Sequence, residues 1–200
     1  TLTEAENTET ALLNVMENIC TGLNWKFGIA WVTEEDKLVQ KAIWSENPME
    51  AKQYNSIFGS SCKLNKGIGL PGRVWDKSKS FWIENLEADD NLPRKEGLLK
   101  LGWQTGFAVP IKDGDRVIAV IECFNKNMLT AKNDLLEVLE SVGSQVGNFL
   151  ERKKAEENLK IAYDELETRV NERTVELANT LNRLLDEMAI KERVQSRLKL

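Results

Sequence analysis

The sequence predicts an α+β domain over residues 1–150, followed over residues 151–200 by a long helix that forms a coiled coil. Three observations predict this architecture. Short β-prone runs and short helical segments alternate through the first 150 residues. From Thr130 onward there is no proline, and after Gly147 there is no glycine. Residues 151–200 carry 22 charged residues, so their narrow apolar seam needs a partner helix to cover it.

The first expected element is an amphipathic helix that ends near Gly22. Its apolar residues recur at helical spacing, and they are Ala5, Leu12, Val15, Met16, Ile19 and Cys20. Two β-prone runs follow at 25–31 and 37–44, separated by the polar turn 34–36, and we expect them to form a hairpin. Strand alternation places four large residues on one side of the first strand. These are Trp25, Phe27, Ile29 and Trp31.

The middle of the chain is expected to mix short helices with short strands. Pro48 opens a short helix that closes at 59–61. The sequence GIGLPGRVW at 67–75 predicts a tight bend into a second helix, because glycines permit the bend and a proline fits the first turn. A short strand is expected at 81–83, and a short helix at 94–101.

Two strands at 105–112 and 115–125 are joined by Asp113-Gly114, a strong hairpin signal. One helix of about 70 residues then follows, far longer than a typical globular helix. Its first part carries an apolar stripe that we expect to pack against the domain, made of Leu135, Leu139, Val142, Val146 and Phe149. Gly143 and Gly147, four residues apart, are expected to allow tight packing against the N-terminal helix.

Composition excludes several classes of protein. Without histidine these residues contain no proximal haem ligand, phosphoacceptor histidine or histidine-based triad. The net charge of −5 does not suit nucleic acid, and no apolar run reaches the roughly 18 residues that cross a bilayer. The three widely spaced cysteines suit neither a disulfide framework nor a metal site. We therefore expect a cytoplasmic fragment that binds no metal, nucleic acid or membrane.

The segments GIGLPGRVW and FAVPIKDGDRVIAVIECFNK (107–126) resemble a GAF domain, and the order of elements over residues 1–150 fits that family. The resemblance implies an antiparallel sheet with signalling helices on one face and a small-molecule pocket on the other. Residues 150–190 resemble the signalling helix of bacterial kinases and cyclases, including Glu172-Arg173-Thr174. The combination implies a multidomain bacterial sensor kinase of cyanobacterial type.

The resemblance also carries implications for cofactors. Bilin-binding members attach the chromophore to a pocket cysteine, usually followed by histidine, and residues 81–105 contain neither. We expect neither covalent bilin nor haem. Residues 125–134 keep only part of the pattern found in members that bind cyclic nucleotides, so cyclic nucleotide binding remains open but is not favoured. An unknown small ligand is the remaining expectation.

The predicted pocket residues are Leu70, Trp75 and Trp82, because the two tryptophans flank the GIGLPG helix, where related domains place ligands. Core packing is the alternative for both tryptophans. Arg73 could assist backbone N–H groups of the same turn in binding an anion. Alternatively, the glycines only permit the bend and Arg73 is solvated.

Cys62 and Cys123 invite an enzymatic alternative, because a branch of the GAF family reduces free methionine sulfoxide with pocket cysteines. That chemistry needs an activated thiolate and a nearby resolving thiol. Cys123 lies in an expected central strand and Cys20 on the apolar face of the first helix, where cysteine is usually an inert small hydrophobe. We therefore favour a non-catalytic regulatory module. A ligand-free structural dimerisation module is the second interpretation, and the thiol enzyme the third.

The apolar seam of residues 151–200 predicts a parallel homodimer, because a charged helix buries a narrow seam only against a partner. The parallel orientation lets both copies deliver output at the same end. The seam residues are Leu159, Tyr163, Leu166, Val170, Thr174, Leu177, Leu181, Leu184 and Met188, with Leu198 at a further d position. The chain begins at Thr1 without methionine and ends within a helical pattern, so we expect an output domain, a kinase or a cyclase, beyond Leu200.

The repeat of this seam is broken once. Val170 and Leu181 both occupy position a but are 11 residues apart, which is not a multiple of seven. This four-residue stutter falls on Glu172-Arg173-Thr174 and should locally unwind the supercoil. We hypothesise that the helix pair switches between two registers there. Harmless sequence drift is the alternative.

Overall fold

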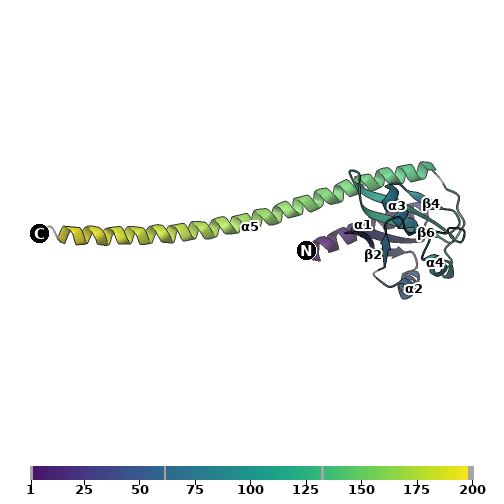
Figure 1. The fold of residues 1–200 in the computed structure, drawn as a ribbon, viewed down its shortest axis with the longest axis horizontal. Helices are drawn as coiled ribbons and strands as arrows, with labels where there is room; N and C mark the ends of the chain where they lie inside the picture. Colours follow the sequence, from purple (N-terminus) through teal and green to yellow (C-terminus); the bar gives the residue numbers. More distant parts are fainter. Residues whose placement is uncertain (1, 61, 132, 198–200) are drawn as a thin grey trace. The chain divides into compact units, whose positions relative to one another are not determined.

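The computed structural model describes residues 2–60, 62–131 and 133–197. They divide into two compact units, Thr1–Arg152 and Lys153–Leu200, which we call the globular unit and the tail. Figure 1 colours the elements along the chain. The globular unit mixes strands and helices, and the long C-terminal helix follows them, so the predicted fold class is confirmed.

The described strands form one antiparallel sheet in the order β3-β2-β1-β6-β5-β4. Its strands are β1 (Phe27–Glu34), β2 (Lys37–Ser45), β3 (Lys63–Asn65), β4 (Phe81–Ile83), β5 (Thr105–Asp113) and β6 (Arg116–Asn125). The two predicted hairpins, β1–β2 and β5–β6, are both present. The second turns at Gly114 with a φ of +57°, a conformation that glycine adopts without strain.

The helices are α1 (Leu2–Leu23), α2 (Pro48–Phe58), α3 (Gly69–Lys77), α4 (Lys95–Lys100) and α5 (Asn133–Arg197). The start of α2 follows from its sequence. Pro48 occupies the first turn, and the side chain of Asn47 accepts a hydrogen bond from the backbone N–H of Met49 at 3.1 Å. Gly69 begins α3 with a φ of +70°, so the GIGLPG bend is a left-handed turn that glycine permits.

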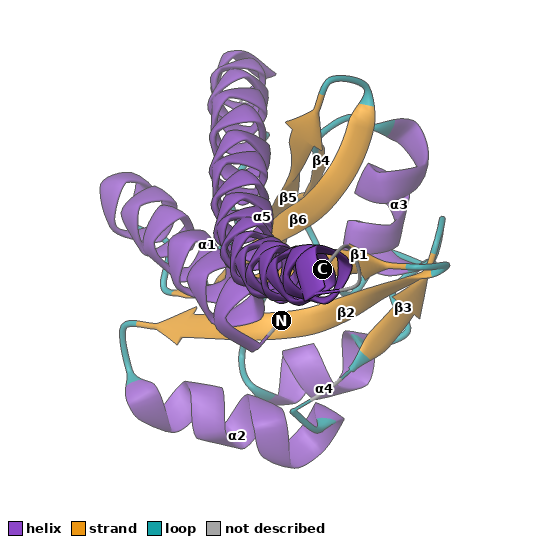
Figure 2. Ribbon diagram, turned by 90° about the vertical axis from the view of Figure 1, so that its left-hand side faces the viewer, coloured by secondary structure: helices purple, strands orange, loops and turns teal. Residues whose placement is uncertain are grey.

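Helices cover both faces of the sheet within the globular unit. Residues of α2, α3 and α4 share one buried cluster with the sheet, which we call the sensor face. Residues of α1 and of the first turns of α5 share a second cluster on the opposite face. Figure 2 shows α1 on one side of β2 and α2 with α4 on the other.

One alternation prediction is wrong at its first residue. Phe27, Ile29 and Trp31 face the sensor face as expected, but Trp25 packs on the opposite face, 4.6 Å between ring centroids from Phe107. The backbone N–H of Trp25 still donates to the Cys20 carbonyl at 2.8 Å, as part of the exit from α1. Strand alternation has therefore not begun at Trp25.

The predicted stripe on the first turns of α5 needs correction. Val142 and Phe149 are 37% and 47% exposed. Leu135, Leu139 and Val146 do pack against the buried cluster on this face, as predicted, and they are joined there by Leu136 and Leu150. A Cβ atom at Gly143 or Gly147 would collide with the carbonyl oxygen of Pro110 or Lys112 in β5, so these glycines let α5 touch the sheet and not α1.

Candidate functional site

The sensor face contains a buried polar cluster centred on Arg94 and Glu122. Arg94 is 4% exposed and Glu122 is fully buried. Nη2 of Arg94 donates to both carboxylate oxygens of Glu122, at 2.6 and 2.7 Å. Nη1 of Arg94 donates to the hydroxyl of Tyr54 at 2.8 Å. The indole N–H of Trp31 donates to Glu122 at 3.1 Å, and the guanidinium lies 4.8 Å from the centroid of that indole ring.

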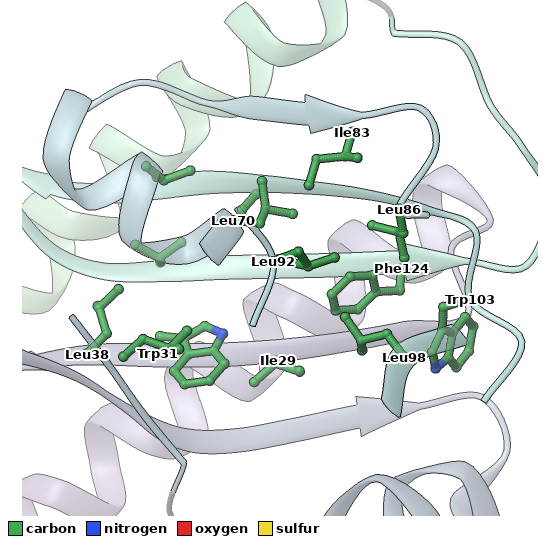
Figure 3. Packing of buried hydrophobic residues seen from close by; sticks show 14 of the residues in the cluster. Ile29, Trp31, Leu38, Leu70, Ile83, Leu86, Leu92, Leu98, Trp103 and Phe124 are labelled. Atoms are coloured by element: carbon green, nitrogen blue, oxygen red, sulfur yellow. The ribbon is translucent and has the colours of Figure 1, made fainter. Parts of the chain in front are cut away.

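Four elements bring these side chains together. Glu122 lies in central strand β6 and shares its face with Val120 and Phe124, since strand residues two apart point the same way. Trp31 extends from neighbouring β1, Tyr54 comes from α2, and Arg94 precedes α4. Figure 3 shows Trp31 among the apolar residues of this face. A ligand or a mutation that moves Arg94 would therefore change contacts of α2, of α4 and of the central strand β6.

Electrostatics couple the members of the cluster. Burial raises the pKa of the Glu122 carboxyl above its ordinary value, and Arg94 offsets only part of this effect. Burial alone would lower the pKa of Arg94, but the charge of Glu122 and the Tyr54 hydroxyl outweigh it and raise that pKa. We take the pair as ionised at neutral pH, because three N–H···O hydrogen bonds converge on the carboxylate and a proton would displace one of them.

Burying an ion pair costs desolvation free energy, and apolar residues of similar volume are often at least as stabilising. Removing one partner is costly because the other charge is then left unpaired. Perturbed, paired charges inside a domain are therefore candidates for a functional role. This cluster is the candidate site that the structure offers on the sensor face.

The predicted pocket residues do not form one pocket. Leu70 is fully buried in the sensor-face cluster, and Trp75 is half-buried against the same cluster. Trp82 packs on the opposite face, where it stacks on Phe107 and donates its indole N–H to the carbonyl of Leu129 at 3.0 Å. The sheet therefore lies between the two tryptophans, and they cannot line a single ligand site.

The geometry of the GIGLPG turn disfavours the anion site. Arg73 donates to the Asp89 carboxylate at 2.9 Å, so its charge already has a partner. The backbone N–H of Gly67 donates to Gly72, that of Ile68 to Asn65, and that of Gly69 to the Asn91 side chain. The turn presents no free N–H at these three positions, and the interpretation that the glycines permit the bend accounts for them.

The cysteines are divided between the two faces of the sheet. Cys62 is half-buried and packs against the sensor-face cluster. Cys20 and Cys123 are buried on the opposite face, with their sulfur atoms 3.5 Å apart. Burial raises the pKa of both the Cys62 and the Cys123 thiols, which disfavours the reactive thiolate. Cys62 and Cys123 are therefore not an activated and resolving pair in this fold.

The structure contains a cavity of about 530 Å³ that the sequence did not predict. Its described lining comes from α1, β2, α2 and Ser60, and includes Gln40 and Asn55. The Gln40 amide donates to Asn55 at 3.3 Å, while its side-chain oxygen is buried without a hydrogen-bond partner among the described residues. None of Leu70, Arg73, Trp75 and Trp82 lines this cavity.

Sequence reasoning missed Arg94, Glu122 and Tyr54. The signal for Glu122 was available, because it is the one charged residue between Val117 and Phe124 in a run that otherwise reads as a buried strand. Arg94 lay in an expected short helix and Tyr54 in another, where neither spacing nor composition marks a buried residue. Only the folded chain shows that the three meet.

Helices packed on both faces of a six-stranded antiparallel sheet are the architecture of a known protein family. The family model described as GAF domain matches residues 5–151. The chain belongs to the GAF domain family. The match covers the globular unit, and the predicted resemblance over residues 1–150 is confirmed. No curated protein matches the chain.

Several solved structures share the fold at low sequence identity. The GAF domain of A. aeolicus nlh2 in an inactive state is 16% identical, with a TM-score of 0.56 over 76% of this chain and 96% of that one. A domain of a putative two-component sensor histidine kinase from Sinorhizobium meliloti is 14% identical, with a TM-score of 0.55 over 78% and 96%. The free methionine-R-sulfoxide reductase of Neisseria meningitidis is also 14% identical, with a TM-score of 0.56 over 72% and 78%.

The described residues show neither a candidate metal-ion site nor a candidate membrane span. Among residues 2–60, 62–131 and 133–197, no group of three or more cysteine, aspartate or glutamate side chains could hold a metal ion. Within the same ranges, no helix combines the length and apolar character that a membrane span requires.

Proposed function

We propose that this chain is the regulatory sensor module of a signalling protein, and that it works as a parallel homodimer joined by the tail. A small ligand or a partner would act on the sensor face, and the helices would carry the change to an output domain such as a histidine kinase of a two-component system. The S. meliloti neighbour comes from a protein of that description. The chain itself would be cytoplasmic and non-catalytic.

The observation that carries the proposal is the exposure of the tail's apolar seam. Leu159, Tyr163 and Leu166 are 71%, 67% and 58% exposed in the single chain. The remaining seam residues, from Val170 to Met188, are exposed as well. Leu198 lies outside the described residues. A helix that carries apolar residues at steps of four and three, and buries none of them, is best explained by a second helix that covers them.

The dimer is tested by placing a charge in the seam of the full chain. Leu166→Glu puts a carboxylate at position d, whereas Thr168→Glu, the matched control, puts one at the outward position f. We expect Leu166→Glu to weaken the dimer by roughly 10-fold or more, because two like charges would be buried at the interface. Light scattering over a concentration series measures this. If both variants and the parent chain are monomers at every concentration, the dimer is refuted.

Sensing is supported by the Arg94–Glu122 cluster, where helices α2 and α4 meet the sheet through one guanidinium. The matching experiment is a thermal-shift screen against small metabolites, including cyclic nucleotides and free methionine sulfoxide. A ligand at 100 times its dissociation constant should add about 2.7 kcal/mol. Binding that is lost in Arg94→Lys, while that variant keeps its cooperative melting, would assign the ligand to this cluster.

The ligand-free structural module remains the second candidate, and one observation favours it. Two fully buried side chains contact Arg94 directly, Tyr54 through its hydroxyl and Trp31 through its indole ring, so they fill part of the space beside the guanidinium. If no metabolite shifts the melting temperature while Leu166→Glu still breaks the dimer, this second candidate stands. Turnover of methionine sulfoxide would instead favour the thiol enzyme, against the separation of Cys62 and Cys123.

A further inference from the structure

One edge of the sheet is open along the second half of β2. Strand β3 pairs only with residues 37–39 of β2, and just beyond them the backbone N–H of Gln40 donates to the carbonyl of Cys62 at 3.0 Å. Within the part of the chain that the structure describes, residues 41–45 have a neighbouring strand on the β1 side only. Figure 2 shows β3 beside one end of β2. The outward backbone N–H and C=O groups of residues 41–45 are therefore left without a strand partner.

The cavity of about 530 Å³ lies at this open edge. Residues 41–43 of β2 line it, together with Leu13 of α1 and Ala51 of α2. Leu13 packs against the buried cluster on one face of the sheet, and Ala51 packs against the cluster on the other. The two helices thus form opposite walls of the cavity, with the strand edge between them. Its volume is in the range of about 300–1,000 Å³ that is usual for binding sites.

A buried polar atom in the cavity lacks a partner. Gln40 is 6% exposed and lines the cavity. Its amide nitrogen donates to Asn55, but its side-chain oxygen accepts no hydrogen bond from the described residues. A buried acceptor without a donor is unfavourable, so a molecule that brings an N–H group to this oxygen gains binding free energy.

The cavity also carries one unbalanced charge. Glu9 of α1 is exposed, lines the cavity and has no ion pair among the described residues. Lys41 lines the cavity as well, but its ammonium group pairs with Glu34. The carboxylate of Glu9 therefore favours a ligand that carries a positive charge on the α1 side.

We propose that the open edge of β2 binds an extended segment of another polypeptide, which adds a strand beside residues 41–45 and places a lysine or arginine near Glu9. A peptide backbone is the ligand that fits, because it offers alternating N–H and C=O groups at the repeat of the strand edge. One of its N–H groups can also reach the free oxygen of Gln40. This binding site is separate from the sensing proposed at the Arg94–Glu122 cluster and does not rest on it.

Peptides selected on the full chain test this site. A phage library of random eight-residue peptides is panned on the parent chain, and the tightest binders are synthesised with acetylated and amidated ends. Fluorescence polarisation then gives their dissociation constants. Ser60→Trp fills the cavity from an exposed position in its lining. Ser56→Trp, the matched control, makes the same change at an exposed residue of α2 outside the lining.

We expect the dissociation constant to rise about 10-fold or more in Ser60→Trp and less than about 2-fold in Ser56→Trp, because only the first indole takes the space of the peptide. The selected peptides should carry lysine or arginine. Glu9→Gln should weaken their binding about 3-fold, since an exposed ion pair contributes modestly. Glu17→Gln, at an exposed residue of α1 outside the cavity lining, should leave it unchanged.

A second measurement uses the parent chain alone, so it does not depend on how the variants fold. Each selected peptide is made in two N-methylated versions, one methylated at odd backbone positions and one at even positions. Alternate residues of a strand direct their backbone hydrogen-bonding groups to opposite sides, so only one version should lose binding, by about 10-fold or more.

Several outcomes would overturn the proposal. Loss of binding in both methylated versions, or in neither, would exclude strand addition. Equal binding by Ser60→Trp and Ser56→Trp, or a library that yields no binder, would exclude the site. If Ser60→Trp instead converts a dimer of the parent chain into a monomer, a second copy of the chain occupies this edge. None of these outcomes decides the thermal-shift test, because Arg94 and Glu122 do not line the cavity.

Discussion

The globular unit and the tail use apolar side chains in opposite ways. In the globular unit, Trp31 and Phe107 are fully buried, whereas in the tail Leu159 and Leu177 are 71% and 70% exposed. Burying one large apolar side chain contributes roughly 1.5–3 kcal/mol. The globular unit therefore obtains this stabilisation from its own fold, while the exposed apolar side chains of the tail do not obtain it in the single chain.

Ion pairs show the reverse arrangement. The Arg94–Glu122 pair lies inside the globular unit, with side chains 4% and 0% exposed. In the tail, Arg173 and Glu176 pair at 2.7 Å on an exposed helix surface, where such a pair contributes little. The comparison shows that one chain separates two tasks. The globular unit gathers several buried hydrogen bonds around one guanidinium, and the tail keeps its charged and its apolar side chains exposed in the single chain.

The largest expected effect comes from breaking the buried pair. Arg94→Met should destabilise the globular unit by about 3–5 kcal/mol, because Glu122 would be left as an unpaired buried charge. The double variant Arg94→Met with Glu122→Leu should recover most of this loss, since neither charge remains. Urea denaturation, followed by tryptophan fluorescence, gives the free energy of unfolding.

Arg116 provides the matched control for this cycle. Its side chain is 67% exposed and pairs with Asp113 at 3.2 Å. Arg116→Met should change the free energy of unfolding by less than about 1 kcal/mol. Equal losses in Arg94→Met and Arg116→Met would mean that the buried cluster does not hold the sensor face together.

A smaller effect is expected from the Tyr54 hydroxyl and from pH. Burial raises the pKa of Tyr54, so its protonated form contributes stability that is fully present below the ordinary tyrosine pKa of about 10 and is lost as pH rises beyond it. Tyr54→Phe should cost about 2 kcal/mol at neutral pH, because Arg94 loses an acceptor. Between pH 9 and about 11 the variant should lose less stability than the parent chain.

Tyr163 is the control for this prediction, since it is the second of the two tyrosines and lies exposed in the tail. Tyr163→Phe keeps the aromatic ring and should leave the unfolding of the globular unit within about 0.5 kcal/mol of the parent. An alkaline loss of stability that is the same in Tyr54→Phe and in the parent would show that Tyr54 is not its source.

Local sequence signals were sufficient for most of the elements but not for the site. Pro48, Asp113-Gly114 and the GIGLPG turn each act through backbone conformation within a few residues, so the helices and hairpins beside them were predicted. Strand β3 was missed because three residues, Lys63–Asn65, are too few for alternation to be recognised. Arg94 and Glu122 meet across 28 residues of chain, and no local pattern encodes such a contact.

The packing of α5 shows the same limit in another form. Helical spacing in the sequence identified apolar residues on α5 but could not tell those that pack on the sheet from those that stay exposed, because both Leu139 and Val142 are apolar. The carbonyl groups of Pro110 and Lys112 decide the division, since only the glycines at 143 and 147 can approach them. The orientation of the helix is therefore a tertiary property.

The smallest expected effect concerns the stutter in the tail. It tests whether the paired helices of the tail can pack in two registers, a property that the globular unit is not expected to share. Inserting three residues after Thr174 would change the 11-residue spacing of Val170 and Leu181 to 14 and complete the heptads. Continuous heptads remove the local unwinding, so the tail dimer should gain up to about 1 kcal/mol, measured as a higher melting temperature by circular dichroism at 222 nm. A three-residue insertion after Glu151, outside the stutter, is the control, and it should bring no gain because it leaves the 11-residue spacing of Val170 and Leu181 unchanged. A gain confined to the Thr174 insertion would mean that the natural break costs stability, as expected of a segment that keeps two registers close in energy. No gain after Thr174 would mean that the break costs nothing, and the two-register hypothesis would lose its physical basis.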